Sequence, residues 1–351
     1  MNELDRYDYD LPTELLALRP PERREDARLM VIDRSTGTIR HESITDLPQL
    51  LEPGDCLVMN DTRVIPARLS GLRTATRGKW EGLFLGTGSD GTWRVIGETR
   101  GQLKPGESIT IVPANDSDGG RTLVLSLEHR DAVGVWTARP DSAQDALCLL
   151  ETFGTTPLPP YLGRRTPDEQ DRLRYQTTFA RRPGAIAAPT AGLHFTPKLL
   201  DECRLRDVAT AWVTLHVGIG TFRPISGERL EDHVMHAEWC SVPRKTIEAV
   251  TAARQQNRRV IAVGTTTVRS MESAAHDGEP REWEGMTELF IRPGFQFRVT
   301  DALLTNFHLP RSTLLVLVSV FAGHDLLRTA YQTAIEEKYR FYSYGDAMLI
   351  L

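Results

Sequence analysis

Two segments that mix histidine, threonine and glycine lie at residues 189–195 (PTAGLHF) and 216–222 (HVGIGTF). His216 closes an alternating run, residues 208–217, whose period of two predicts a strand. Imidazole titrates near neutral pH, and glycine lets a backbone approach a ligand closely. We therefore interpret the two segments as the rim of an active site, with His216 as the strongest acid–base candidate and His194 as the second.

Five of the nine histidines sit in polar clusters, and it is this clustering that favours chemistry: His194, His216, His233, His236 and His308. Each one alone could equally be a hydrogen-bonded, half-buried histidine. His233 and His236 would share one face of a helix, and Glu238 follows closely, which is a weak metal-binding signal without a further ligand set. We expect no metal, and a metal-dependent hydrolase stays open as an alternative hypothesis.

The segment 264–267 (GTTT) falls between an apolar run and a predicted helix at 265–275. Free backbone N–H groups at such a turn suit an anionic or carboxylate ligand, although ordinary threonine capping explains the motif equally well. Arg269 and Glu272 would lie on the same helix face. No GxGxxG follows the first strand, so a dinucleotide site has no support.

The elements that must position these residues alternate between helices and strands, except for one interval. Short β-rich runs without helices predict a small barrel, at 65–72, 80–86, 92–98, 108–113, 121–128 and 133–139. The fold class is therefore α/β: a mixed α/β main domain, a layered sheet with helices, formed by residues 1–62 and 150–351. A small β-barrel domain, residues 63–149, interrupts it.

Within the main domain the pattern predicts strands at 27–33, 38–42, 56–59, 208–217, 259–263, near 288–292 and at 347–351. It predicts helices between the two polar segments, at 243–257, at 265–275 and around 326–339. A polar bend is expected at 306–310.

Composition restricts the possible partners. With 42 basic and 47 acidic residues in 351, the formal charge of −5 creates no overall field that attracts nucleic acid. The four cysteines are far apart, the N-terminus is polar, and the longest apolar run, 314–322, is shorter than the ~20 residues that span a bilayer. We expect a cytoplasmic protein with no membrane partner.

Longer motifs carry a resemblance across nearly the whole chain. They are YDLP (9–12), PGDCLVMNDTRVIPARL (53–69), AAPTAGLHFT (187–196), VTLHVGIGTFRPI (213–225), HVMHAEW (233–239), RVIAVGTTTVRSMES (259–273), TNFHLPRSTLLVLVS (305–319) and YRFYSYGDAML (339–349). In this order they resemble the S-adenosylmethionine:tRNA ribosyltransferase-isomerase family of queuosine biosynthesis. Ala302 stands where that family usually has glycine, and the barrel interval matches loosely.

The resemblance implies transfer and isomerisation of the ribosyl group of S-adenosylmethionine. The acceptor would be 7-aminomethyl-7-deazaguanine at the wobble position of a tRNA anticodon, and the products epoxyqueuosine-tRNA, adenine and methionine. S-adenosylmethionine would be a consumed substrate, so no separate cofactor is expected, and the chain would act as a monomer.

Such a reaction needs a neutral base for a hydrogen beside the sulfonium, a proton donor for adenine and an uncharged amine. The resemblance implies His216 or His194 as base, with His236 and Glu238 as proton donor or sulfonium partner. Residues expected to hold substrate are Asp61, Arg63, Thr190, Gly218, Gly220, Thr265, Thr266, Arg269, Glu272, Asn306 and His308. Phe195, Phe222 and Phe307 could stack on an unstacked base or pack in the core. A non-catalytic RNA-binding module, using the barrel, is the second alternative.

Overall fold

The computed structural model describes residues 3–113, 120–164, 167–218, 220, 225, 227 and 229–351. The chain forms two compact units. The first, here the sheet unit, comprises Met1–Arg63, Arg174–Arg182 and Ala188–Leu351, and the second, the barrel unit, comprises Val64–Leu173 and Pro183–Ala187. The barrel unit thus continues beyond the expected boundary at 149 and takes in a later segment as well.

One nine-stranded sheet organises the sheet unit, in the order β16-β14-β13-β3-β15-β17-β18-β1-β2. The strands are β1 (Arg28–Asp33), β2 (Thr38–Ser43), β3 (Cys56–Asn60), β13 (Ala209–Leu215), β14 (Glu238–Val242), β15 (Val260–Val263), β16 (Trp283–Thr287), β17 (Ala302–Asn306) and β18 (Ala347–Ile350). In its middle, β13, β3, β15 and β17 are parallel neighbours. Their carboxyl ends therefore meet at one edge, called here the carboxyl edge, where open α/β sheets bind ligands.

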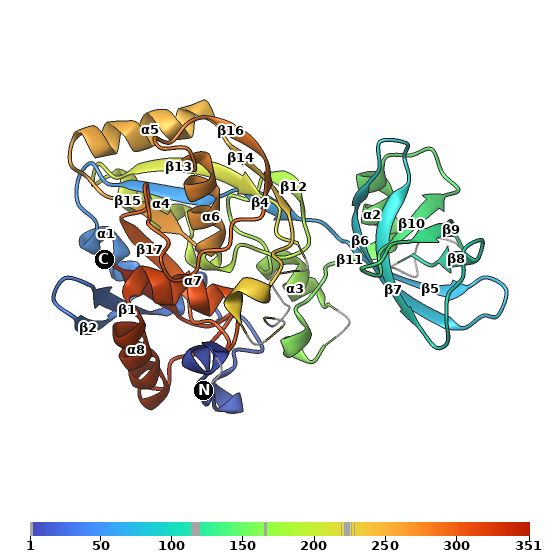
Figure 1. Cartoon of the computed structure of the whole chain (residues 1–351), viewed down its shortest axis with the longest axis horizontal. Helices are drawn as coiled ribbons and strands as arrows, with labels where there is room; N and C mark the ends of the chain where they lie inside the picture. The colour runs from blue at the N-terminus through green and yellow to red at the C-terminus, as the bar shows by residue number, and fades with distance from the viewer. Residues whose placement is uncertain are drawn as a thin grey trace. The chain divides into compact units, whose positions relative to one another are not determined.

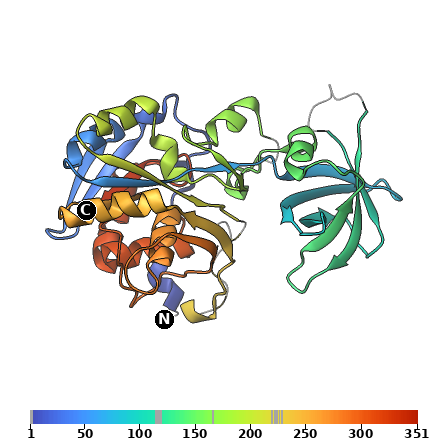
Figure 2. The same ribbon diagram turned by 90° about the horizontal axis from the view of Figure 1, so that it is seen from above.

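Helices cover both faces of this sheet, as Figure 1 and Figure 2 show. They are α1 (Leu47–Leu50), α4 (Pro197–Arg204), α5 (Arg244–Gln255), α6 (Thr265–Ala274), α7 (Thr313–Ala322) and α8 (His324–Glu336). Alternate residues of one strand enter different cores: Met30 and Ile32 pack with α7 and α8, whereas Leu29 and Val31 pack with α4. Such near-continuous apolar strands are typical of a sheet buried on both faces.

Short 3-10 helices complete the connections: η1 (Glu3–Tyr7), η2 (Thr13–Leu15), η3 (Arg24–Asp26), η4 (Ile44–Asp46), η6 (Pro160–Leu162), η7 (Thr190–His194) and η9 (Leu230–Asp232). Of these, η7 contributes Ala191 to the same core as α4, beside the carboxyl edge. Among the described residues no single helix is long and apolar enough to cross a membrane; α7 and α8 together meet that test, with a bend of 114° between them.

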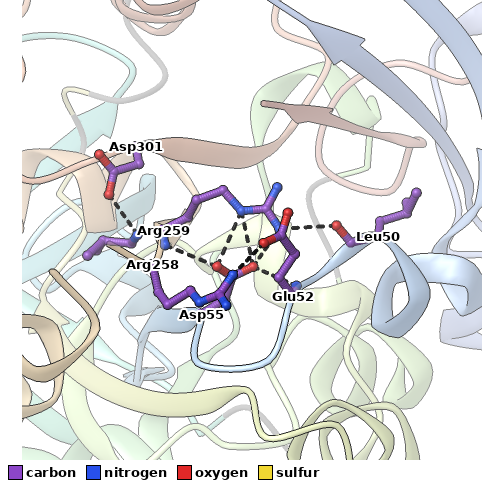
Figure 3. Close-up of polar contacts among 7 residues, drawn as sticks. Leu50, Glu52, Asp55, Arg258, Arg259 and Asp301 are labelled. Carbon is purple, nitrogen blue, oxygen red and sulfur yellow. Dashed lines mark hydrogen bonds and ion pairs between the residues drawn. The ribbon is translucent and has the colours of Figure 1, made fainter. Parts of the chain in front are cut away.

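An ion pair between Asp55 and Arg259 lies at the opposite, amino-terminal ends of β3 and β15 (Figure 3). Asp55 has no exposed surface, and its carboxylate accepts from Arg259 Nη2 at 2.5 Å, from the Arg259 backbone N–H at 3.0 Å and from the Glu52 backbone N–H at 2.8 Å. Arg258 pairs with Glu52 nearer the surface, at 2.7 Å. Because every acceptor position around Asp55 is used internally, we assign this cluster to stability.

The barrel unit is a closed barrel of six strands, β5-β6-β7-β10-β9-β8, joined by the pairing of β5 with β8. The strands are β5 (Arg68–Arg73), β6 (Lys79–Thr87), β7 (Trp93–Thr99), β8 (Ser108–Ile111), β9 (Leu123–Arg130) and β10 (Trp136–Pro140). The predicted barrel is confirmed, and each of its six strands overlaps one predicted run.

Two facing glycines make room for the largest side chain in the barrel. Gly82 and Gly97 pair across β6 and β7, and a Cβ added to either would lie 2.0 or 2.3 Å from the Trp80 indole. Trp80 is 1% exposed. The remaining elements are β4 (Thr62–Val64), α2 (Ala146–Phe153), β11 (Gly154–Thr155), α3 (Glu169–Arg174) and β12 (Arg182–Ala185).

The predicted strand near 288–292 is wrong, because the strand β16 ends at Thr287. Residues 288–292 have no regular structure, although Ile291 is buried in the core. Apolar residues there reflect packing of an irregular segment, which periodicity does not distinguish from a strand.

Candidate active site

Asn60, the last residue of β3, ties three elements together at the carboxyl edge. Its amide Nδ2 donates to the Leu215 carbonyl at 3.0 Å and to Thr266 Oγ1 at 3.2 Å, and its Oδ1 accepts from the Leu215 N–H at 3.1 Å. Asn60 is 1% exposed, so these bonds are made in a poorly solvated environment. The ends of β3 and β13 and the first turn of α6 are therefore fixed relative to one another.

His216, the first residue after β13, is oriented from three directions. Its Nδ1 lies 2.8 Å from Thr62 Oγ1, its backbone N–H donates to the Trp239 carbonyl at 2.9 Å, and its ring stacks on Trp239 at 4.8 Å and 22°. Burial lowers the pKa of His216, and the nearby Asp61 carboxylate opposes part of that effect. His216 is therefore a neutral, oriented imidazole at neutral pH.

Asp61 is 2% exposed and its carboxylate is already engaged. Oδ1 accepts from Thr214 Oγ1 at 2.5 Å, and Oδ2 accepts from Arg181 Nε and Nη2 at 3.1 and 2.7 Å. Asp61 thus holds the strand ends and supplies a negative charge near His216. Arg63, two residues later, is exposed to solvent.

Glu238 and Arg269 form a buried ion pair, each 5% exposed, which joins β14 to α6. The other Glu238 oxygen, Oε1, accepts from the Gly218 N–H at 2.7 Å, and Arg269 Nε donates to the Leu289 carbonyl at 3.0 Å. Two of the predicted residues thus hold a third, Gly218, just beyond His216.

A cavity of about 30 Å³ opens beside this pair. Gly220, His236, Glu238 and Arg269 line it together with apolar side chains from the 289–291 segment and α7. Gly220 allows a close approach, since a Cβ there would lie 2.7 Å from His236 Cδ2. The cavity therefore brings together four predicted site residues, of which His236 is exposed.

Asn306, at the end of β17, connects the other polar segment to the same edge. Its Oδ1 accepts from Thr190 Oγ1 at 3.0 Å, while Nδ2 faces His194 Nε2 at 3.1 Å and the Asp346 carbonyl at 3.4 Å. The Asp346 carbonyl can only accept, so this end of the amide is the NH2 group. His194 Nε2 must then accept as well, and the imidazole proton is on Nδ1.

His194 is consequently a neutral hydrogen-bond donor, with its only lone pair used by Asn306. Burial lowers the pKa of His194 to about 4, with the Asp346 carboxylate opposing that change. Of the two histidines predicted as base, His216 is the one whose surroundings leave a ring nitrogen for that role.

The turn 264–267 has the predicted position, between β15 and α6. Gly264 has φ of +90°, which favours glycine, and a Cβ there would lie 3.5 Å from that of Ala191 in η7. Thr267 Oγ1 bonds back to the Val263 carbonyl at 2.8 Å, while Thr265 is buried and Thr266 partly exposed. The turn thus adjoins the PTAGLHF segment.

Two predicted residues lie apart from this group. His308 is buried, its Nε2 lies 3.0 Å from Thr305 Oγ1, and burial lowers its pKa to about 3. Glu272 accepts from the N–H groups of Arg298, Val299 and Thr300 at 2.8, 3.2 and 3.0 Å. The Glu272 carboxylate thus holds the chain that leads into β17.

The metal hypothesis lacks its structural premise. Residues 233–237 form no helix, so His233 and His236 are not presented on one helical face. Across the part of the chain that the structure describes, no three His, Cys, Asp or Glu side chains gather in a metal-binding group.

Sequence reasoning missed Asn60, Thr62, Thr214, Trp239 and Arg181, which orient His216 and Asp61. A signal existed for the first two, because a polar NDT run begins at the last residue of the buried strand β3. Of the three phenylalanines, Phe195 and Phe307 have no exposed surface and pack in the two cores. Phe222 lies outside the described residues.

Comparisons with known proteins agree on one family. A family model described as queuosine biosynthesis protein matches residues 4–350. The S-adenosylmethionine:tRNA ribosyltransferase-isomerase of Halothermothrix orenii is 42% identical over 351 residues, covering 99% of this chain and 100% of the relative. That of Symbiobacterium thermophilum is 46% identical over 358 residues, covering 99% of each.

A solved structure gives the same result. The crystal structure of S-adenosylmethionine tRNA ribosyltransferase from Thermotoga maritima matches with a TM-score of 0.56 and 36% identity. The match covers 99% of this chain and 100% of that chain.

Proposed function

The chain belongs to the queuosine biosynthesis protein family, and from that premise we propose that it is an S-adenosylmethionine:tRNA ribosyltransferase-isomerase. It would move the ribosyl group of S-adenosylmethionine to 7-aminomethyl-7-deazaguanine at the tRNA wobble position. The products would be epoxyqueuosine-tRNA, adenine and methionine. The observation that supports this most is the oriented, neutral His216 at the carboxyl edge of the parallel strands.

We assign the removal of a hydrogen beside the sulfonium to His216. A base with a lowered pKa stays unprotonated at neutral pH, and Thr62 and Trp239 limit the orientations of its ring. A positioned general base contributes about 10²–10⁴-fold to a rate. His194, as an Nδ1–H donor, is assigned to substrate binding instead.

The sulfonium and the adenine proton donor are assigned to the cavity beside Glu238. A carboxylate close to a sulfonium stabilises its positive charge, and the apolar wall formed by Leu289, Ile291 and α7 suits its carbon substituents. Of the two histidines that line this cavity, His236 is exposed and His233 is partly buried, so that His236 is better placed to exchange protons with solvent. Arg269 pairs with Glu238 and holds its carboxylate beside the cavity.

Substrate contacts are proposed for Thr190, Gly218, Gly220, Thr265, Thr266 and Asn306, which border the carboxyl edge. Asp61 and Arg269 support the edge through the bonds described above, whereas Glu272 holds the chain that leads into β17 and His308 contacts Thr305. Because S-adenosylmethionine is itself consumed, we propose no separate cofactor and no metal. The four free cysteines suit a reducing compartment, and we propose a cytoplasmic monomer.

The test is release of adenine and methionine from S-adenosylmethionine by the full-length protein. We expect both products in equal amounts, and only with tRNA that carries the aminomethyl base. Tight binding of this tRNA with no adenine release would support the RNA-binding module instead. Activity lost on chelation and restored by a divalent metal would support the hydrolase.

A further inference from the structure

A second, smaller cavity borders His194. Its volume is about 20 Å³, room for little more than one small group. Arg24, Arg174, His194, Ser343 and Tyr344 line it, with two prolines. None of the side chains that line it is a carboxylate.

His194, which lines this cavity, carries a hydrogen-bond donor. His194 is 4% exposed, and the Asn306 contact fixes the proton of its imidazole on Nδ1. Among the described residues Nδ1 has no hydrogen-bond partner. An N–H beside a cavity that has no acceptor of its own favours a ligand that provides one.

Arg174 adds a positive charge to this cavity. Its Nη1 and Nη2 donate to the carbonyls of Glu22 and Pro21 at 2.9 and 2.7 Å, and no carboxylate of the described residues pairs with it. Its Nε is buried and has no acceptor. The guanidinium is thus held rigidly by neutral partners while its charge stays available.

Arg24 brings a second guanidinium to the same place. It donates to the carbonyls of Leu193 and Gln176 at 3.0 and 2.8 Å. Burial and the charge of Arg174 lower the pKa of Arg24, which means that the two cations repel each other. An anion between them would relieve that repulsion.

We propose that this cavity binds one anionic oxygen-bearing group, a carboxylate or a phosphate, held by Arg174, Arg24 and the Nδ1–H of His194. Its small volume excludes a base or a sugar and suits one or two oxygen atoms. If the proposed function holds, two substrates carry such a group: the carboxylate of S-adenosylmethionine and a backbone phosphate of tRNA.

The first experiment needs no turnover and uses inorganic phosphate as the probe. Phosphate binding to the full-length protein is followed by 31P line broadening in the wild type and in Arg174→Gln. We expect the affinity to fall about tenfold, since a charge-assisted hydrogen bond is lost. Arg206→Gln, which removes an exposed arginine elsewhere on the sheet unit, is the matched control and should bind as the wild type does.

Two further variants isolate the histidine. In His194→Asn the amide nitrogen replaces Nδ1 and should keep phosphate binding within about threefold, whereas His194→Gln places its amide at Nε2 and should lose about tenfold. Thermal unfolding verifies that each variant is folded, and Arg174→Met, which also removes the charge, replaces Arg174→Gln if the latter is not. Equal phosphate affinity in the wild type, Arg174→Gln and His194→Gln would overturn the proposal.

The second experiment distinguishes the two sources. If the carboxylate occupies the cavity, Arg174→Gln weakens S-adenosylmethionine about tenfold and leaves decarboxylated S-adenosylmethionine unchanged. If a tRNA phosphate occupies the cavity, Arg174→Gln instead weakens the binding of an anticodon stem-loop. The salt dependence of that binding then corresponds to about one fewer released counterion. If Arg174→Gln changes the affinity for neither substrate, the assignment of both anionic groups to this cavity is overturned. This outcome does not depend on whether the protein turns over its substrates, so it is distinct from a failure of the proposed function.

Discussion

Thr62 holds the His216 imidazole through a contact of 2.8 Å between Thr62 Oγ1 and His216 Nδ1. Thr62→Val keeps the shape of the side chain and removes this contact. We expect kcat to fall about 10–100-fold with KM little changed, because a misoriented base loses rate rather than substrate affinity. Thr62→Ser should restore most of the rate. Steady-state kinetics measure both values, and a change confined to KM would contradict this role.

His194 and His308 make stability depend on pH. Their pKa values in the folded protein are about 4 and about 3, against an ordinary 6.5. Between pH 6.5 and about 4 only the unfolded chain takes up these protons, so stability falls with decreasing pH by about 1.4 kcal/mol per pH unit for each histidine and is constant above that window.

The matching measurement is urea unfolding from pH 4.5 to 6.5. His308→Gln should reduce the pH slope by about 1.4 kcal/mol per pH unit, whatever its effect on stability at pH 7. The exposed His276→Gln serves as the control and should keep the wild-type slope. Parallel slopes for all three proteins would be inconsistent with a neutral, buried His308.

Sequence alone identified the residue types at the site but not their partners. His216 was predicted from its place after an apolar strand, and the structure puts it there. That Asn306 uses the lone pair of His194 was not predictable, because the contact joins residues 112 positions apart and depends on the position of a third carbonyl. Asn306 and His308 have different partners because β17 ends at Asn306, so that His308 lies beyond the strand and its ring contacts Thr305.

At the level of elements, the parallel strands have a stability cluster at one end and the proposed site at the other. Arg259→Met would leave the Asp55 carboxylate buried without its charged partner. We expect a loss of about 3 kcal/mol in the free energy of unfolding. Affinity for S-adenosylmethionine should be unchanged, because the cluster lies at the amino-terminal ends of β3 and β15.

Arg258→Met is the control for this change. Its ion pair with Glu52 is largely exposed, so we expect a loss below about 1 kcal/mol. Denaturant unfolding compares the two variants. If both variants lose the same free energy of unfolding, the burial of Asp55 does not determine the loss in stability.

Most elements were predictable because their apolar period matched their structure. The strands of the barrel and the helices α5, α6 and α8 fall where the pattern predicts them. β14 was not recognised, since the HVMHAEW segment reads as a helical pair of histidines, and β16 was misplaced into 288–292. In both places tertiary packing, not local periodicity, selects the strand.

The whole molecule consists of two units with separate cores. In the barrel core the Trp80 indole packs directly against Gly82 and Gly97. Gly97→Ala would place a methyl group 2.3 Å from the indole. We expect it to destabilise the barrel unit by about 3 kcal/mol or more. The sheet unit should keep its own unfolding transition and its affinity for S-adenosylmethionine.

Calorimetry and a binding titration test this separation. Trp80→Leu combined with Gly97→Ala should recover part of the lost stability, because the smaller side chain leaves room for the methyl group. Loss of S-adenosylmethionine binding in a Gly97→Ala protein whose sheet unit is still folded would contradict the assignment of that site to the sheet unit alone.

The extent of the inserted unit shows what a sequence pattern does not reveal about the whole chain. The barrel strands are recognisable in the sequence as short β-rich runs separated by turn residues. This pattern predicts that the unit starts at residue 63, and the observed unit starts at Val64. Its later end at Leu173 and the return of Pro183–Ala187 involve irregular segments with no period to detect.

The most direct measurement is single-turnover adenine release from S-adenosylmethionine, with precursor tRNA, by the wild type and His216→Gln. If His216 is the base, the variant should lose at least about 10²-fold in rate while it binds S-adenosylmethionine with wild-type affinity and unfolds at the same temperature. A His216→Gln protein that releases adenine at the wild-type rate would contradict that assignment.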